Sequence, residues 1–198
     1  MGFSLSWIAI RDAAPEKINS LLSVRPTGLR EEFPESKIVA AQLPNGWYLV
    51  VLNRNSLDDA LLKKVSSAGE LVYCYVEEHV MYSSAASWKD GKQIWSVIHD
   101  AQNGIRHLDV SGDVPKVLAV IAEKLNAEQD AYSDKKPEVD YIFDIPVELA
   151  KELTGFRHDQ DMPGMLDDAF EVLEPIKDPD SKATLGRKLR ELFGSRSK

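Results

Sequence analysis

Apolar and polar residues alternate in the first part of the chain in the way that is typical of β-strands. Residues 3–10 alternate and then become continuously apolar, which predicts a strand buried at its far end. Two further strand-like runs, 37–43 and 47–53, flank the sequence Pro44-Asn45-Gly46. Because these turn residues favour a chain reversal, we expect the two runs to form an antiparallel hairpin.

The β pattern continues through the middle of the chain. Residues 70–82 are rich in β-formers and are interrupted near the two glutamates. Asp90-Gly91 lies between two aromatic-bearing runs and predicts a tight hairpin, because a type I′ turn needs positive φ at both central positions. Asn103-Gly104 predicts another reversal, between 93–99 and 106–110. The middle of the chain is thus expected to be an antiparallel meander.

Helical spacing of apolar residues identifies the remaining elements. It predicts helices over residues 15–22, 56–69, 114–129 and 146–155, with Ser56 as an N-cap and the third helix as the longest. Residues 25–34 are expected to form a loop and residues 139–143 a short strand. The predicted fold class is α+β, a mainly antiparallel sheet packed by about four to five helices.

The charge pattern changes near the end of the chain. We expect residues 1–156 to form an α+β core domain. Residues 157–180 hold eight acidic and two basic residues, whereas 181–198 hold six basic residues and one acidic residue. The basic stretch has an apolar stripe at helical spacing, which predicts an amphipathic C-terminal helix. Either this helix packs against the acidic segment of the same domain, or it binds a partner or a membrane surface.

Composition narrows the classes of partner and compartment. The chain has 198 residues, 43% hydrophobic, with a formal net charge of −8, which opposes binding to nucleic acid and to anionic lipid. Its single cysteine, Cys74, excludes an intramolecular disulfide. There is no run long enough for a membrane helix and no secretory layout at the N-terminus. We therefore expect a cytoplasmic protein with no nucleic-acid or membrane partner.

The most reactive group of side chains lies around residues 74–84. Common catalytic motifs are absent, including the phosphate-binding loop, the nucleophile elbow and the His-Glu-x-x-His helix. The candidates are His79 as base, Glu77 or Glu78 beside it, and Cys74 or Ser83 as nucleophile. On an unbroken strand Cys74 and His79 would face opposite sides, so core filling is the main alternative for the cysteine.

The spacing of histidines and aspartates along the sequence does not match a known metal-binding or cofactor-binding motif. His99, His107 and His158 each have an aspartate nearby in sequence, and such pairs could hold zinc only if the fold gathered them. The aspartates of 159–168 lack the glycine and the closing glutamate of a calcium loop. We predict no bound metal and no cofactor.

Two sets of residues are candidates for binding a protein partner. The first is the acidic set, whose concentrated charge would attract a basic partner: Asp159, Asp161, Asp167 and Asp168. The second is the pair Trp88 and Trp95 on the predicted hairpin, which would form a binding ribbon if exposed and core if buried.

Three stretches of the chain resemble an uncharacterised family of bacterial proteins. They are Ser6-Trp7-Ile8-Ala9-Ile10-Arg11, residues 76–85 (Val-Glu-Glu-His-Val-Met-Tyr-Ser-Ser-Ala) and residues 139–146 (Val-Asp-Tyr-Ile-Phe-Asp-Ile-Pro). The family carries no assigned activity, so the resemblance implies a bacterial cytoplasmic setting and no catalytic residue.

Two functional hypotheses remain open. The first is a non-enzymatic protein-binding module, an inhibitor or immunity-type protein that neutralises a basic partner. The second is a small hydrolase-like enzyme that uses His79 with Glu77 or Glu78 and a nucleophile at Cys74 or Ser83.

Overall fold

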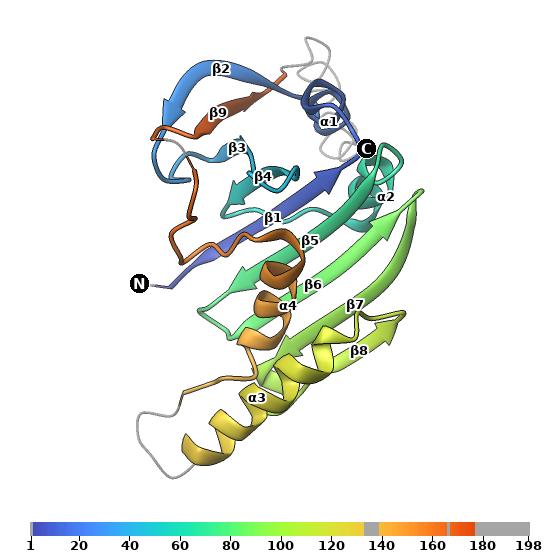
Figure 1. Ribbon diagram of the computed structural model, residues 1–198, viewed down its shortest axis with the longest axis vertical. Coiled ribbons are helices and arrows are strands. Elements are labelled where there is room, and N and C mark those ends of the chain that lie inside the picture. The colour runs from blue at the N-terminus through green and yellow to red at the C-terminus, as the bar shows by residue number, and fades with distance from the viewer. Residues whose placement is uncertain (1, 133–138, 166, 177–198) are drawn as a thin grey trace, which may run out of the picture.

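A computed structural model describes residues 2–132, 139–165 and 167–176. Its nine strands form one antiparallel sheet in the order β2-β9-β3-β4-β1-β5-β6-β7-β8 (Figure 1). The strands are β1 (Ser4–Arg11), β2 (Val24–Glu31), β3 (Ile38–Gln42), β4 (Tyr48–Asn53), β5 (Glu70–Glu77), β6 (Tyr82–Lys89), β7 (Lys92–Asp100), β8 (Asp109–Gly112) and β9 (Phe170–Pro175). The predicted α+β class with a mainly antiparallel sheet is confirmed.

Four α-helices cover the two faces of the sheet. They are α1 (Pro15–Leu22), α2 (Asp59–Val65), α3 (Val117–Tyr132) and α4 (Asp144–Thr154), and a single 3₁₀ turn spans Ala101–Asn103. In Figure 1, α3 and α4 lie on one side of the sheet, and α1 and α2 lie on the other. No helix in these ranges combines the length and apolar content needed to cross a bilayer.

The central strands are buried on both faces. Trp7 on β1 packs in the cluster beneath α3 and α4, while its neighbour Ile8 packs in the cluster beneath α1 and α2. Side chains of a strand alternate between faces, so a strand covered by helices on both sides is favoured by apolar residues at successive positions, as in Trp7 to Ile10. This accounts for the continuous apolar run in the first strand of the sequence.

The two predicted hairpins are present. β3 pairs with β4 across the Pro44-Asn45-Gly46 reversal. At the β6–β7 turn, Asp90 and Gly91 have φ values of 51° and 71°. Positive φ at both positions is the requirement of the type I′ turn.

The helix boundaries in the structure lie within a few residues of those predicted from the sequence. The N-cap of α2 is Asp58, whose carboxylate accepts from the N–H of Leu61, and not Ser56. Gly155 ends α4 in the left-handed conformation, with its N–H donating to the carbonyl of Lys151. Both arrangements satisfy backbone groups that a helix end leaves unpaired.

Residues 25–34 were expected to form a loop, and for most of this range that expectation is wrong. β2 runs through Pro26 and Gly28, both of which normally weaken a strand. Among the strands of the described residues, β2 is the outermost and bonds only to β9. A proline is tolerated in an edge strand because one side of the strand needs no N–H donor.

The predicted strand at 139–143 is also wrong. Asp140 accepts through Oδ1 from the backbone N–H groups of Ile142 and Phe143, both at 3.1 Å. This side-chain capping folds the segment into a turn that leads into α4. The apolar residues Ile142 and Phe143 are buried in the turn instead of in a strand.

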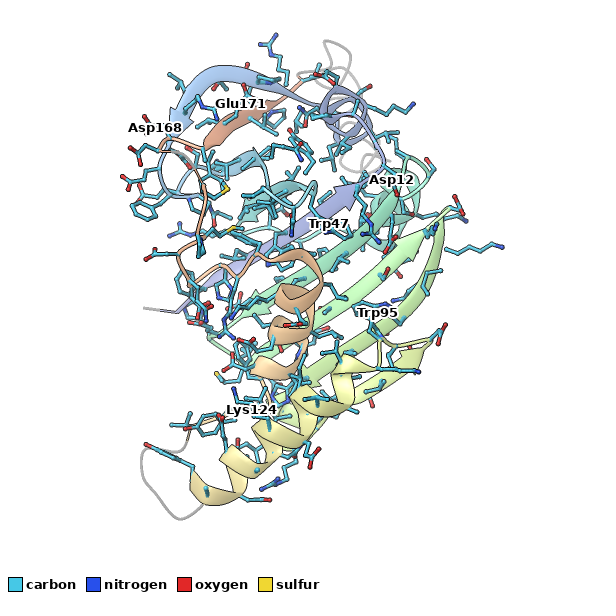
Figure 2. All side chains as sticks on the ribbon, viewed as in Figure 1. Asp12, Trp47, Trp95, Lys124, Asp168 and Glu171 are labelled. Carbon is cyan, nitrogen blue, oxygen red and sulfur yellow. The ribbon has the colours of Figure 1, made fainter. Side chains whose placement is uncertain are left out.

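The acidic segment contains a strand that the sequence did not indicate. β9 lies between β2 and β3 and pairs antiparallel with both. Asp168, labelled in Figure 2, lies where the chain turns into this strand. The amphipathic helix expected in 181–198 lies outside the described residues.

Candidate functional site

The turn between β5 and β6 carries one hydrogen-bonded imidazole and carboxylate. Nδ1 of the exposed His79 lies 2.7 Å from Oε1 of Glu77, and Glu77 also accepts from the hydroxyl of Ser4 at 2.5 Å. These two hydrogen bonds lower the pKa of Glu77. His79 and Glu78 line an open hollow of about 520 Å³. The turn therefore brings together the predicted base and its carboxylate partner.

The two candidate nucleophiles lie elsewhere. Cys74 is fully buried in the core, and burial raises the pKa of its thiol, which opposes formation of a thiolate. Ser83 is also buried, and its hydroxyl donates to the carbonyl of Phe143 at 2.6 Å. Within the described residues, neither side chain is hydrogen-bonded to His79. The structure thus pairs His79 with Glu77 but brings neither nucleophile to them.

The two hairpin tryptophans are buried on opposite faces of the sheet. A register shift next to Trp88 places Ser87 opposite Trp95 and Gln93 opposite Trp88. Because the adjacent Ser87 and Trp88 point to opposite faces, Trp95 packs beneath α3 and α4, and Trp88 packs with α2 on the other face. Neither ring forms an exposed ribbon.

A hollow lined by described residues lies at one edge of the sheet, where the ends of several strands meet. Its volume is about 620 Å³, within the range of ligand sites. It is bounded by the start of β1, the segment after β2, the end of β4 and the segment between α4 and β9. We call it the edge cavity. These four segments are far apart in the sequence, so no local sequence motif marks the cavity.

Carboxylates surround the edge cavity. Its acidic lining residues are Glu32, Glu35, Asp159, Asp161 and Asp167. No lysine or arginine is among the described residues that line it. Four of the five carboxylates have no ion-pair partner within the described ranges, the exception being Asp159. Like charges held close together create a local negative potential that attracts a cation.

The walls of the edge cavity are aromatic and thioether side chains. They are Phe3, Phe33, Phe156, Phe170, Met162 and Met165. Phe33 is 54% exposed and Phe3 is 43% exposed. Large apolar side chains left in water beside a cavity are typical of a binding surface.

The segment that carries most of the acidic residues is fixed by one arginine. Arg157 has a side chain only 10% exposed and forms ion pairs with Asp144, Glu148 and Asp159. Burial opposes its charge, but the hydrogen bond to Asp159 and the neighbouring carboxylates outweigh burial and raise the pKa of Arg157. The guanidinium thus ties the start of the acidic segment to α4.

The segment after β2 forms the opposite wall of the edge cavity, and hydrogen bonds fix its position. Asn53 donates to the carbonyls of Pro34 and Ser36, both at 2.7 Å. Glu31 accepts from the backbone N–H groups of Glu35 and Ser36. These hydrogen bonds fix the backbone next to Phe33 and at Glu35, so both residues are positioned at the cavity.

His158 is the most unusual lining residue. Its side chain is 1% exposed, and neither ring nitrogen has a hydrogen-bond partner among the residues that the structure describes. The ring of Phe3 stands edge-on to it, with 4.9 Å between centroids, and Oε1 of Glu78 lies 4.0 Å from its Nε2. Burial lowers the pKa of His158, so the imidazole is neutral at pH 7.

His99 and His107 form hydrogen bonds within the fold. His99 is fully buried between the carbonyl of His107 and the carboxylate of Asp140. His107 accepts from the N–H of Asp100. In the ranges that the structure describes, no three histidine, cysteine or acidic side chains are placed to hold a metal ion.

The sequence indicated only part of the edge cavity. Of the acidic set, Asp159, Asp161 and Asp167 line it, whereas Asp168 does not and instead accepts through its backbone carbonyl from Arg30. The lining residues that sequence reasoning missed include Glu32, Phe33, Glu35 and His158. The local signal for Glu32, Phe33 and Glu35 was the acidic and aromatic composition of residues 31–35, Glu-Glu-Phe-Pro-Glu.

The edge cavity is therefore an acidic, partly aromatic hollow with an unpartnered neutral imidazole in its wall. Comparisons with protein-family models, with curated proteins and with solved structures find no match to this chain.

Proposed function

We propose that the protein is a non-enzymatic binding module that captures a basic partner protein, as a cytoplasmic inhibitor or immunity-type protein does. The observation that supports this proposal most directly is the edge cavity, where five carboxylates lie beside exposed aromatic rings with no lining lysine or arginine among the described residues. Carboxylates steer a basic partner, and aromatic and methionine side chains supply the contact area.

The charge of the site favours a protein partner over nucleic acid. The net charge of −8 and the carboxylates of the cavity repel phosphate. Electrostatic attraction of a basic surface raises the association rate and falls with salt. Capture is therefore expected to weaken as ionic strength increases.

The test uses the full chain as bait in an extract of its native host, over a range of salt. We expect recovery of a basic protein in stoichiometric amount, followed by a direct titration with that protein once purified. The variant carries Glu35→Gln, Asp161→Asn and Asp167→Asn, which remove three unpaired cavity carboxylates. We expect its affinity to fall by at least about tenfold.

The matched control removes the same charge from another surface. Asp113→Asn, Glu123→Gln and Glu152→Gln neutralise three exposed carboxylates that do not line the edge cavity. This control should bind within about twofold of the unaltered protein. Equal binding by both variants, or no basic protein at any salt concentration, would overturn the proposal.

The enzymatic alternative retains one favourable observation, the hydrogen bond between His79 and Glu77 beside an open hollow. It lacks a nucleophile next to the imidazole, because Cys74 and Ser83 are buried elsewhere. Hydrolysis of an activated ester by the protein, abolished by His79→Ala, would favour this alternative. Equal rates for the two proteins would count against it.

A further inference from the structure

His158 is a buried polar side chain with no hydrogen bond to any part of the chain that the structure describes. A buried donor or acceptor that bonds to nothing costs free energy, so such groups are rare in folded proteins. The other buried histidine, His99, has both nitrogens bonded. The indole nitrogens of Trp7 and Trp88 are also unbonded among the described residues, but both rings lie in the core, whereas His158 lines the edge cavity.

The neutral imidazole offers one N–H donor and one lone pair. A cationic nitrogen brought next to it can donate to the lone pair, which a protonated imidazole could not accept. The acidic side chains nearest in sequence, Asp159 and Asp161, line the same cavity. A neutral acceptor and several carboxylates in one hollow match an ammonium or guanidinium group.

The apolar walls of the edge cavity suit the methylene chain that carries an ammonium or guanidinium group. Phe33, Met162 and Met165 offer aromatic and thioether surface beside the carboxylates. Long cationic side chains lay their methylene stem on apolar surface, and aromatic faces attract the charge itself. The ring of Phe3, 43% exposed, stands edge-on to His158.

We infer that the edge cavity is an anchor pocket for one arginine or lysine side chain of the partner, with His158 as the hydrogen-bond acceptor in its wall. This inference rests on the proposed capture of a basic protein, and it names the side chain of that protein that the cavity binds. The stem lies along Phe33, Met162 and Met165, and Asp161 and Asp167 neutralise the charge. The Phe3 ring moves aside when the side chain enters.

The test uses the full-length protein and small probes in place of the partner. The probes are the N-acetyl amides of Phe-Arg, Phe-Lys and Phe-citrulline, of which the citrulline compound is neutral and nearly isosteric with arginine. Binding is followed by NMR through the ring signals of the four histidines, assigned with single histidine variants. We expect the two cationic probes to shift the signals of His158, and the citrulline probe to bind at least about tenfold more weakly.

Two variants and one control locate the binding. His158→Phe keeps an aromatic ring and removes the acceptor, and Phe33→Ser removes an exposed wall that the fold does not need. Each should weaken the arginine probe by about fivefold or more. His79→Gln, which changes an exposed histidine outside the edge cavity, should leave the affinity unchanged.

The outcomes separate this inference from the proposed function. Suppose that a basic partner is captured, but the cationic probes bind no more tightly than the citrulline probe or do not shift the NMR signals of His158. The anchor-pocket inference is then refuted, while the proposed binding function is retained. If the cationic probes bind at His158 while no basic partner is recovered, the anchor pocket stands and the proposed function fails.

Discussion

His99 and Asp140 form a buried pair in which Nε2 lies 3.0 Å from Oδ2, with side chains 0% and 8% exposed. Nδ1 of the same ring faces the carbonyl of His107 at 2.8 Å. Because both nitrogens face acceptors, the imidazolium form satisfies the site best. Burial opposes this charge, but the bonds to Asp140 and His107 outweigh it and raise the pKa of His99.

The first prediction concerns removal of the charge of Asp140. Asp140→Asn keeps an oxygen that can accept from the N–H groups of Ile142 and Phe143 but leaves His99 without its counter-ion. We expect the free energy of unfolding to fall by about 3 kcal/mol, measured by urea denaturation near pH 6. The control is Asp109→Asn, beside the less buried His107, where the change should stay within about 0.5 kcal/mol. Equal effects of the two changes would contradict the assignment.

The second prediction gives the pH dependence of the same pair. The pKa of His99 is raised above its ordinary value of 6.5. Its stabilisation is therefore fully present below pH 6.5 and is lost as the pH rises through the raised value. The difference in unfolding free energy between the unaltered protein and Asp140→Asn should shrink from about pH 6 to about pH 9. A difference that grows over this range would show that His99 is not the titrating group.

The third prediction concerns the arginine that fixes the acidic segment. Arg157→Gln leaves Asp144, Glu148 and Asp159 close together without their shared cation. We expect a loss of about 3 kcal/mol in unfolding free energy, partly recovered by Arg157→Lys, which keeps the charge without the planar fork. Arg25→Gln breaks an exposed pair with Glu174 and should cost less than about 1 kcal/mol. A loss no larger than that of Arg25→Gln would refute the anchoring role.

The fourth prediction concerns the reactivity of Cys74. Its thiol is fully buried and has a raised pKa, so it should resist an aromatic disulfide reagent at pH 8 in the native state. The same reagent should titrate one thiol at once when the protein is unfolded in guanidinium. Rapid native labelling would restore Cys74 as a candidate nucleophile.

The fifth prediction concerns β9. Val172 pairs with Val39 in β3, and its carbonyl accepts from the hydroxyl of Thr27 in β2. Val172→Pro removes an N–H from a strand bonded on both sides and should cost about 3 kcal/mol or more. Val172→Thr keeps the N–H and the branched shape and should cost about 1 kcal/mol. Thermal unfolding of the two variants measures the difference, and similar melting temperatures would argue against the pairing.

The sequence predicted elements whose signal is local. Asp90-Gly91 fixes its hairpin because the two residues between the strands decide the turn type. β2 and β9 were missed because their strand structure comes from pairing with each other across most of the chain. Pro26 and the glutamates of β9 oppose a strand locally, and the tertiary pairing overrides that preference.

The candidate site was predictable only on its acidic side. Three aspartates of 159–167 stood out because charge concentrates in one stretch of sequence. Phe33 and His158 could not be joined to them, because their proximity depends on where β2 ends and where α4 ends in the folded sheet. The absence of a bond to His158 is a property of three-dimensional packing alone.

Within the described residues, β2 is bonded to the rest of the sheet only through β9. The long stretch of chain from Glu31 to Phe170 separates the two strands, so on the ribosome β2 is made well before this neighbour. A nascent chain must therefore carry β2 without that partner until β9 has been made. Proline and charged side chains in a strand oppose its pairing with other chains, and Pro26, Arg25 and Arg30 give β2 these features.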